Sequence, residues 1–511
     1  MSSRNNRRIA KNTMMLYFRM LLMMGVSLFT VRVVLDTLGT VDYGLYNVVG
    51  GIVTMFSFLS ATMSGASQRF FSFELGRKDY TQLKRIFSIT LLIYAIFGAI
   101  VLFLAETVGL WFLNHKLTIP SERISAANWV YQFSIFSFIV TMFRTPYNAI
   151  IIANEKMDVY AYVSIVEVIL KLLIVYLLLL FSFDKLKLYA ALMFVVTLIV
   201  ALVYIIYSRR KFEETKFTFY WNISLFKEIL SFSFWNLFGA IAGIFKGQGV
   251  NIVLNMFFGP AVNAARGIAF QVNSALNQFV QNFMTATKPQ IIKYYAEGEK
   301  GKMFKLVFLS SKLSFLLLFI VTMPVILETN FVFNLWLKET PEYVILFSRL
   351  ILINTLIDSL SYPLITAAQA TGKIKQYQAL IGGVMLLNLP VSYFFLMLGY
   401  SAQSVFIIAI IISIINLFLR LFMLKKMIGL SLKQFVSDVL IRISITAVIA
   451  YILPCFVFIK LSYGISRFFI VVLMGFVSSC IVIYSISLLK NERKYIIKSI
   501  LFIKDKIFHL N

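Results

Sequence analysis

Apolar residues fill most of the chain in long runs that short polar segments separate. A helix of about 20 apolar residues is long enough to cross the hydrocarbon core of a bilayer, so each run predicts a membrane-spanning helix. The pattern therefore predicts an all-α polytopic membrane protein with about 14 transmembrane helices. The runs lie near residues 12–35, 43–65, 86–110, 126–153, 158–182, 186–208, 231–257, 262–287, 306–328, 342–370, 376–398, 402–424, 437–459 and 464–489.

Composition supports this prediction. Hydrophobic residues make up 60% of the 511 residues, the mean hydropathy is +0.86, and only 14% of residues are charged, well below the share in soluble domains. The first residues, MSSRNNRRIAK, are basic, but the following apolar run has full transmembrane length and no small-residue cleavage site. We therefore expect a first spanning helix and not a removed signal peptide. Cys455 and Cys480 lie in late apolar segments, so neither a disulfide framework nor a metal site is predicted.

The formal net charge of +26 is explained by topology. If the N-terminus is cytoplasmic, most of the 48 Lys and Arg residues fall at cytoplasmic helix ends, in clusters such as 209–211 and 490–498. This distribution follows the positive-inside rule and places both termini in the cytoplasm. The basic residues are spread over every cytoplasmic loop without a nucleic-acid motif, so nucleic acid is not an expected partner.

One corner of the chain, between two predicted helices, is repeated in the sequence. PYNAIIIANEKMDVY (146–160) and PLITAAQATGKIKQY (363–377) place Pro, Ala, Lys and Tyr at the same spacing, 217 residues apart. FELGRKDYTQLKRIF after the second predicted helix resembles YAEGEKGKMFKLVF after the eighth, which aligns Gly76 with Gly298. A weaker match pairs VVLDTLG (33–39) with IVLNMFFG (252–259). Repeats six helices apart are parallel. We expect two like-oriented six-helix lobes, 1–212 and 213–428, and then two additional helices with a basic cytoplasmic tail in 429–511.

The stretches NTMMLYFRMLLMMGVSLFTVRVVLDTLGTVDYGLYNVVGGI and ELGRKD, together with the 146–160 corner, resemble bacterial polysaccharide transporters. These belong to the multidrug/oligosaccharidyl-lipid/polysaccharide exporter superfamily, and the most similar branch is the flippases of O-antigen-type repeat units. The resemblance implies translocation of undecaprenyl-pyrophosphate-linked oligosaccharides by alternating access. It also implies that the protein lies in the bacterial cytoplasmic (inner) membrane and serves surface polysaccharide biosynthesis. Neither an enzymatic activity nor a cofactor is implied.

The same resemblance implies that helices 1, 2, 7 and 8 border a central cavity, where basic residues engage the pyrophosphate. The second predicted helix has no basic residue before Arg69, so the charge pattern is only partly matched. A lipid-linked substrate with a pyrophosphate, sugars and an apolar tail needs a wet cationic cavity between the lobes that opens to the membrane lipid.

Intramembrane cations are the candidates for this cavity, because a charge near the bilayer centre costs about 2.5 to 3.5 kcal/mol unless it faces water or a partner. Lys246 lies in GAIAGIFKGQGVN, where the glycines predict either a loosened helix or close helix packing. Arg266 shares a polar stripe with four amides, which we expect to line the cavity: Asn263, Asn273, Asn277 and Gln281. Arg19, Arg32 and Arg349 are further substrate-binding candidates, with snorkelling towards the interface as the alternative for Arg19 and Arg32.

Intramembrane carboxylates are fewer. Glu167 lies one helical turn before Lys171, so the two either neutralise each other or take part in coupling to H⁺ or Na⁺. Asp358 is likewise either a coupling residue or the partner of a cation.

Two other functions stay open. A cation-coupled multidrug antiporter of the same superfamily would need a carboxylate-rich pocket, whereas basic residues outnumber acidic ones within the predicted helices. A membrane-embedded polysaccharide polymerase or glycosyltransferase would need convergent catalytic residues on a sizeable loop. The loops are short, His115 and His509 are isolated, and no catalytic motif is present. We therefore do not expect an enzyme.

Overall fold

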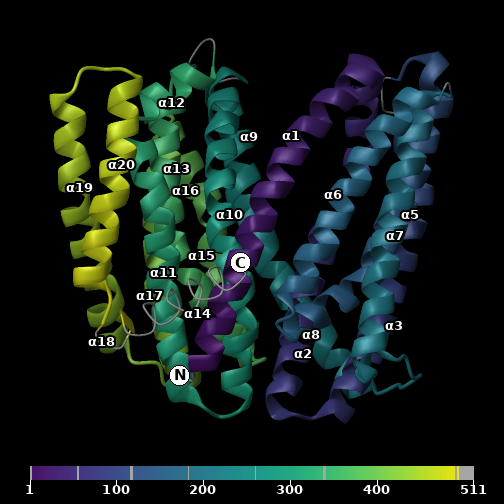
Figure 1. The fold of residues 1–511 in the computed structure, drawn as a ribbon, viewed down its shortest axis with the longest axis horizontal. Coiled ribbons are helices and arrows are strands. Elements are labelled where there is room, and N and C mark those ends of the chain that lie inside the picture. The colour runs from purple at the N-terminus through teal and green to yellow at the C-terminus, as the bar shows by residue number, and fades with distance from the viewer. Residues whose placement is uncertain are drawn as a thin grey trace, which may run out of the picture. The chain divides into compact units, whose positions relative to one another are not determined.

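The fold is helical throughout the part of the chain that the structure describes. The computed structural model describes residues 3–54, 57–115, 119–181, 183–258, 260–337, 341–489 and 492–493. Every regular element in these ranges is a helix (Figure 1). Ten helices in the same ranges are long and apolar enough to cross a membrane. The predicted all-α membrane class is confirmed.

The helices follow the predicted apolar runs closely after the first two. Those before residue 216 are α1 (Ser3–Thr54), α2 (Ser57–Arg77), α3 (Tyr80–Leu104), η1 (Ala105–Gly109), α4 (Leu110–His115), η2 (Ser121–Arg123), α5 (Ile124–Ala153), α6 (Met157–Leu180), α7 (Lys185–Lys211) and η3 (Glu213–Thr215). Those after it are α8 (Ile223–Ile244), η4 (Phe245–Gly249), α9 (Val250–Phe258), α10 (Pro260–Ala296), α11 (Lys300–Leu327), α12 (Thr329–Trp336), α13 (Val344–Ser359), α14 (Ser361–Ala370), α15 (Lys375–Leu386), α16 (Asn388–Met397), α17 (Ser404–Ile428), α18 (Leu432–Phe435), η5 (Val436–Ile441), α19 (Arg442–Lys460), α20 (Ile465–Val482) and η6 (Ile483–Ser487).

The loop predicted between the first two runs, at 36–42, is wrong. Helix α1 continues through this segment to Thr54, because the segment holds no proline and a single helical glycine, Gly39, costs only about 1 kcal/mol. Thr37 donates a hydrogen bond from Oγ1 to the carbonyl oxygen of Val33 at 2.8 Å. Such a bond tends to bend a helix without ending it.

The described residues form two compact units. The first unit comprises residues 12–237, in which α5 packs against α2, α3 and α7. The second unit comprises residues 1–11 and 238–511, in which α10 packs against α11, α13 and α14. The division between the units falls inside α1 and inside α8. The lobe boundaries expected at 212/213 and 428/429 stay predictions.

The repeated corner has the same backbone geometry in both copies. Helix α5 ends at Ala153 and helix α14 at Ala370, and two residues later Glu155 has φ 61° and Gly372 has φ 75°. These left-handed residues are 217 positions apart, which is the offset of the sequence match. Only glycine adopts this conformation without steric cost, so the second copy suits the corner better than the first.

The second match also marks equivalent helix ends, although its alignment shifts by two residues. Lys78 (φ 59°) and Gly298 (φ 74°) are the left-handed residues. The N–H groups of Lys78 and Asp79 donate to Leu75 and Glu74, and those of Gly298 and Glu299 donate to Tyr295 and Tyr294. Lys78, and not Gly76, therefore corresponds to Gly298. The third match fails, because α1 continues through residue 39 whereas α9 ends at Phe258.

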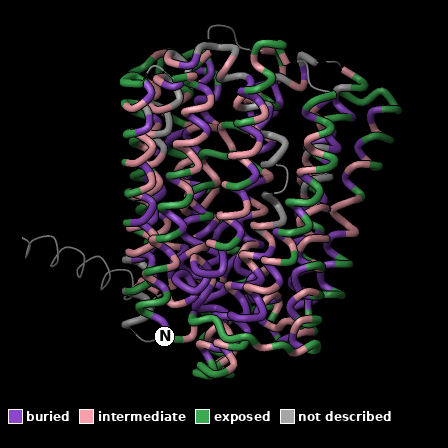
Figure 2. The backbone as a smooth tube through the Cα atoms, turned by 90° about the vertical axis from the view of Figure 1, so that its right-hand side faces the viewer, coloured by how far each residue is buried: buried purple, intermediate pink, exposed green. Residues whose placement is uncertain are grey.

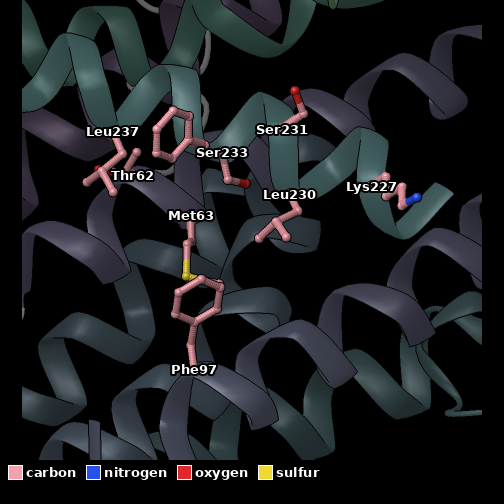
Figure 3. Close-up of a pocket in the computed structure, with 9 residues that line it drawn as sticks. Thr62, Met63, Phe97, Lys227, Leu230, Ser231, Ser233 and Leu237 are labelled. Carbon is pink, nitrogen blue, oxygen red and sulfur yellow. The ribbon is translucent and has the colours of Figure 1, made fainter. Parts of the chain in front are cut away.

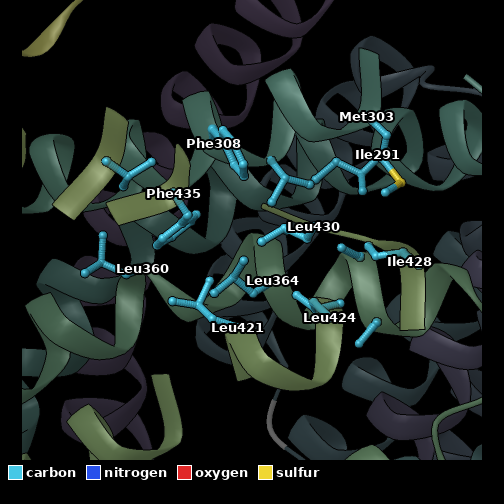
Figure 4. Close-up of a cluster of buried hydrophobic side chains, with 14 of the residues drawn as sticks. Ile291, Met303, Phe308, Leu360, Leu364, Leu421, Leu424, Ile428, Leu430 and Phe435 are labelled. Atoms are coloured by element: carbon cyan, nitrogen blue, oxygen red, sulfur yellow. The ribbon is translucent and has the colours of Figure 1, made fainter. Parts of the chain in front are cut away.

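A large apolar cluster fixes the helix ends of the second unit. Ile291 of α10, Phe308 of α11, Leu364 of α14, Leu421 of α17 and Phe435 of α18 meet there, and the rings of Phe308 and Phe435 lie 5.5 Å apart (Figure 4). Close packing among these side chains resists deformation, so it holds α10, α14 and α17 in register with one another. Figure 2 shows that buried backbone gathers toward the end of the helices where the N-terminus lies.

Two buried ion pairs fasten the C-terminal helices to this unit. Arg467 of α20 donates to both carboxylate oxygens of Glu328 at 2.7 and 2.9 Å, and the Glu328 side chain is fully buried. The ammonium group of Lys312 in α11, also fully buried, lies 2.7 Å from Glu492 and 3.1 Å from the Ser487 carbonyl oxygen. Removing one partner of a buried pair typically costs about 3 to 5 kcal/mol. Helices α19 and α20 are therefore an integral part of the second unit.

Arg123 joins three helices of the first unit at the end opposite the repeated corner. Its guanidinium binds Asp42 of α1 and lies 2.8 Å from Asp184, which precedes α7. Asp184 also caps α7, because it accepts hydrogen bonds from the N–H groups of Leu186 and Lys187 at 3.1 and 3.2 Å. One arginine thus links α1, the start of α5 and the start of α7.

A π-helical segment of the first unit, η1, packs closely against Tyr131. The Tyr131 hydroxyl, fully buried, donates to the Ala105 carbonyl oxygen at 2.7 Å. A Cβ atom on Gly109 would overlap this hydroxyl. Gly109 is therefore needed for the close approach of Tyr131.

Candidate functional site

A polar pocket of about 290 Å³ lies inside the second unit. Its wall combines side chains from α8 to α10, from α13 to α17 and from the π-helical segment η4. We call it the polar pocket. Its polar lining residues are Lys246, Arg266, Asn273, Asn277, Asn354, Thr355, Asp358, Tyr362 and Asn388. The structure therefore brings together five residues that the sequence singled out, namely Lys246, Arg266, Asn273, Asn277 and Asp358.

Lys246 enters this pocket from a helix that is locally unwound. The segment Phe245–Gly249 is π-helical between α8 and α9, which is the loosening that the glycine pattern predicted. Such π segments occur often at functional sites. The Lys246 ammonium lies 2.9 Å from Ser413 Oγ and 3.7 Å from Asp358 Oδ2.

Asn354 completes a ring of polar contacts around Lys246. Ser413 donates to its Oδ1 at 2.8 Å, and its Nδ2 donates to Asp358 at 2.9 Å. The ring therefore holds one positive and one negative charge with two neutral polar groups between them. Lys246 is neutralised inside the pocket by Asp358.

The glycines of this helix serve both purposes that the sequence suggested. A Cβ atom on Gly239 would lie 2.5 Å from the Gln378 side chain, and one on Gly249 would lie 2.9 Å from Leu389. These two glycines allow α15 and α16 to approach closely. Gly247 instead faces open space, lines the pocket, and accepts a hydrogen bond from Arg266 on its carbonyl oxygen.

Arg266 is almost fully buried in the pocket wall, with 7% of its surface exposed. One terminal nitrogen donates to the Gly247 carbonyl oxygen at 2.7 Å, and the guanidinium carbon lies 4.3 Å from the centre of the Phe270 ring. Its Nε has no hydrogen-bond partner among the described residues. The pocket therefore contains a buried cationic donor with unused capacity.

Asn388 supplies a second unused donor. It is 1% exposed, its Oδ1 accepts from the Ser392 hydroxyl at 3.1 Å, and its Nδ2 has no partner in the described part of the chain. A buried polar group without a partner costs about 1 to 3 kcal/mol. Because Arg266 and Asn388 line the same pocket, a ligand rich in hydrogen-bond acceptors would satisfy both donors.

The amide stripe of α10 divides between the pocket and other surroundings. Asn273 accepts from Thr355 at 2.6 Å, and Asn277 accepts from Tyr362 at 3.3 Å, both at the pocket. Asn263 instead donates to the backbone and side-chain oxygens of Asn251, each at 2.8 Å. Gln281 is exposed, and neither it nor Asn263 is among the residues that line the pocket.

The other predicted cations lie elsewhere. Arg349 donates to the Ile326 carbonyl oxygen at 3.1 Å and to Thr329 Oγ1 at 3.2 Å, so it joins α13 to the end of α11. Arg19, in the first unit, donates to Ser164 Oγ at 2.6 Å and lies 4.4 Å from the centre of the Tyr160 ring. The backbone of Arg32 lies in α1, but its side chain is outside the described residues.

Glu167 and Lys171 form an ion pair at 2.7 Å on α6, and both side chains are partly exposed. This contact agrees with the interpretation in which Glu167 and Lys171 neutralise each other. No group of His, Cys, Asp and Glu residues suited to a metal ion occurs in the described ranges.

Sequence reasoning missed three residues around Lys246 and Arg266: Asn354, Asn388 and Ser413. A signal was present for two of them, because Asn354 precedes Asp358 by four residues and Asn388 precedes Ser392 by four. Polar residues at this spacing share one face of a helix. Ser413 is a single hydroxyl in the apolar helix α17 and carries no comparable signal.

No protein-family model matches the sequence, and no curated protein sequence matches it either. Solved structures do match the fold. The architecture is that of the MATE family transporters of the MOP superfamily, which are membrane transporters.

Three solved structures illustrate the likeness. An outward-facing multidrug resistance MATE family transporter has a TM-score of 0.66 and 14% identity, with 82% of this chain and 96% of that chain covered. The MATE transporter ClbM in complex with Rb⁺ has a TM-score of 0.67 and 16% identity, with 84% and 96% covered. A MOP superfamily transporter from Pyrococcus furiosus, described as having a binding pocket of reverse polarity, has a TM-score of 0.64 and 15% identity, with 82% and 96% covered. At these identities the comparison shows the fold alone.

Proposed function

We propose that this protein is a membrane transporter that flips lipid-linked oligosaccharides, carried on undecaprenyl pyrophosphate, across the bacterial cytoplasmic membrane. The transporter fold and the sequence resemblance support this proposal. The observation that carries it is Arg266, which is buried in the polar pocket with its Nε unpaired among the described residues. Asn388 lines the same pocket, and its Nδ2 is likewise unpaired among those residues.

The donors of the pocket suit a pyrophosphate. Phosphate oxygens accept several hydrogen bonds at once, and arginine can supply two parallel N–H groups to them. The amides of Asn273, Asn277 and Asn354 provide further polar groups for sugar hydroxyls. A volume of about 290 Å³ is at the lower end for ligand pockets, so it suits the pyrophosphate and the adjoining sugar and not a whole repeat unit.

The charge balance of the pocket also favours an anion. Lys246 and Arg266 are two cations, and Asp358 is the single carboxylate among the described lining residues. A phosphate that enters the pocket would compete with Asp358 for Lys246, whose ammonium lies 3.7 Å from that carboxylate. In this proposal Asp358 is the counter-ion of Lys246 before substrate binds and the candidate for coupling to H⁺ or Na⁺.

A cation-coupled multidrug antiporter is the second candidate function. The Asp358 carboxylate and the aromatic rings of Phe270 and Phe406 in the same pocket favour it, since such groups attract organic cations. The pairing of Asp358 with Lys246 weighs against it, because the carboxylate is already neutralised. A polymerase or glycosyltransferase has no observation in its favour.

The substrate class is tested with purified protein in proteoliposomes that contain undecaprenyl-pyrophosphate-oligosaccharide. Flipping is measured as the fraction of glycan that becomes accessible to an impermeant periodate reagent. Wild type should expose glycan faster than empty liposomes, and Arg266→Ala should reduce this rate about 10- to 100-fold. Arg209→Ala, at an exposed arginine of α7, is the matched control and should leave the rate unchanged.

The same liposomes distinguish the two candidate functions. Export of a fluorescent organic cation by wild type, with no flipping of glycolipid, would establish the antiporter and overturn the flippase. In cells, we expect the wild-type gene to restore surface polysaccharide in a flippase-null strain and Arg266→Ala to fail at matched membrane abundance. Normal surface polysaccharide with Arg266→Ala would reject the polar pocket as the pyrophosphate site.

A further inference from the structure

A second pocket lies inside the first unit, and its chemistry is the reverse of the polar pocket. It encloses about 520 Å³ between α2, α3 and α8. We call it the apolar pocket. Its walls are mainly the side chains of Met63, Phe97, Leu230 and Leu237 (Figure 3). Phe234 also lines the pocket. The polar groups of its lining are three hydroxyls and one cation, Lys227.

Lys227 stands at one end of the apolar pocket. In Figure 3 its ammonium points away from Met63 and Phe97, at the far end of the row of α8 side chains. The residue is exposed, and no hydrogen bond or ion pair engages it among the described residues. Ser231 follows by one helical turn, so its hydroxyl lies on the same face of α8 as Lys227.

The neighbouring carboxylate does not neutralise this lysine. Glu228 is the next residue, so its side chain leaves α8 about 100° around the helix from Lys227. The mouth of the apolar pocket therefore keeps a cation and a hydroxyl available to a ligand.

Exposed aromatic residues place this mouth at a membrane interface. Phe219 is 77% exposed and Trp221 is 50% exposed, and both lie just before α8 begins at Ile223. Of these two, Trp221 is of the kind that gathers at the level of the lipid headgroups. Lys227, one turn into α8, therefore lies where lipid phosphates are found, and the apolar walls extend from there along the helix into the membrane.

We propose that the apolar pocket binds the first part of the polyprenyl chain of the lipid-linked substrate at the start of transport, with the chain's phosphate at Lys227 until the headgroup enters the polar pocket. This inference rests on the proposed function and adds a chain-binding site to it. The ligand class is a single-chain lipid phosphate. Its apolar chain would pack against Met63, Phe97 and Leu230, and its phosphate would accept from Lys227 and Ser231.

A single chain fits this pocket better than other ligands. A phospholipid carries two acyl chains side by side, and a pocket of about 520 Å³, in the range of small-molecule sites, would leave one of them outside. A soluble anion would make no use of the apolar walls. An organic cation would be repelled by Lys227.

The chain site is tested with a polyprenyl phosphate that carries a photoreactive diazirine on its first isoprene units, added to the full-length protein in nanodiscs. Crosslinked peptides are mapped by mass spectrometry. We expect crosslinks to Met63, Phe97 and Leu230. Leu230→Trp fills the pocket and should reduce their yield at least about tenfold, whereas Leu179→Trp, at an exposed position of α6, should not.

A second variant tests the contact between Lys227 and the phosphate without adding bulk to the apolar pocket. Lys227→Gln should weaken binding of polyprenyl phosphate about two- to fivefold, because an exposed ion pair contributes little more. It should leave binding of the uncharged polyprenol unchanged. Lys211→Gln, at an exposed lysine of α7, is the matched control.

Three results would overturn the chain site: crosslinks outside the apolar pocket, equal yield in Leu230→Trp, or equal competition by phosphatidylglycerol. Arg266→Ala should slow flipping about 10- to 100-fold but leave the crosslinks intact. A wild type that flips glycolipid without crosslinks at Met63, Phe97 or Leu230 would reject the chain site and keep the proposed function. A wild type that crosslinks there but flips no glycolipid would reject the proposed function and keep the chain site.

Discussion

The two units share backbone geometry but differ in the chemistry of their interiors. Both copies of the repeated corner place a left-handed residue at the same step, at Glu155 and at Gly372. The pocket of residues 12–237 is walled by apolar side chains, whereas the pocket of residues 238–511 contains two cations, a carboxylate and several amides. A repeated backbone therefore does not require repeated chemistry. In the function we propose, one unit first receives the lipid chain with its phosphate, and the other then binds the charged headgroup.

Among variants that test this difference between the two pockets, the largest effect on glycolipid flipping is expected at Arg266. Arg266→Glu should abolish glycolipid flipping, because it replaces attraction of the phosphate by repulsion. Arg266→Ala should retain about 1 to 10% of the wild-type rate, and Arg266→Lys should retain more, since lysine keeps the charge but not the two parallel N–H groups. Initial flipping rates in proteoliposomes at matched protein content give this ranking. Equal rates for Lys and Ala would show that the charge of Arg266 is not what the substrate uses.

The two π-helical segments offer the next test. Gly109→Ala, in η1, should destabilise the protein by about 1 to 3 kcal/mol, because its Cβ would overlap the buried Tyr131 hydroxyl. Gly247→Ala, in η4, meets open space and should leave thermal stability unchanged while slowing transport. Melting of the detergent-solubilised protein, followed by fluorescence, measures both. A lower melting temperature for Gly247→Ala than for Gly109→Ala would contradict the view that η1 is packed and η4 is open.

A smaller effect, of opposite sign, is expected at Asp358. Asp358→Asn removes the counter-ion of Lys246 while Asn354 and Ser413 stay in place. The free ammonium should then bind phosphate more tightly, and affinity for polyprenyl pyrophosphate should rise about two- to fivefold. Equilibrium binding of the labelled lipid measures this. A multidrug antiporter would instead lose binding of organic cations with this variant, and unchanged affinity for both ligands would remove Asp358 from the site.

The smallest effect concerns the link between Arg123 and Asp184 in the first unit. Burial alone would raise the pKa of the Asp184 carboxyl, but hydrogen bonds from the Lys187 N–H and from Arg123 hold it below its ordinary value. A pKa that folding lowers contributes stability above the ordinary value, and this contribution is lost as pH falls through the lowered pKa.

Asp184→Asn should therefore lower stability at pH 7 by no more than about 1 kcal/mol, because the side chain is 30% exposed. The variant should also lose less stability than wild type between pH 5 and pH 3. Glu213→Gln, at a 94% exposed carboxylate, is the control. Parallel pH curves for wild type and Asp184→Asn would show that this carboxylate does not contribute to stability.

The sequence predicted much of the helical pattern because apolar runs and bilayer thickness leave few alternatives. It also predicted the loosened helix at Lys246, since four glycines in eleven residues weaken a helix wherever it lies. The 36–42 segment misled the prediction because Asp, Thr and Gly are frequent in loops. Inside α1 their backbone groups stay in the helix, and Thr37 bonds back to Val33.

The site was only partly predictable because neighbouring helices decide which way a polar residue faces. Asn263 and Asn273 lie on the same stripe of α10, yet one binds Asn251 and the other contacts Thr355 in the pocket. Ser413 reaches Lys246 from a helix that is 167 residues away in the chain. No spacing rule along a single helix contains that information.

The order of synthesis gives the buried ion pairs of the C-terminal helices a further meaning. Lys312 and Glu328 leave the ribosome long before their partners Glu492 and Arg467. Until the last hairpin inserts, the growing chain carries two charges in positions that the finished protein seals from water. A chain that stops near residue 428 would lack both partners and leave these two charges unpaired. We therefore expect a shortened chain to be unstable and degraded, and not to form a smaller transporter.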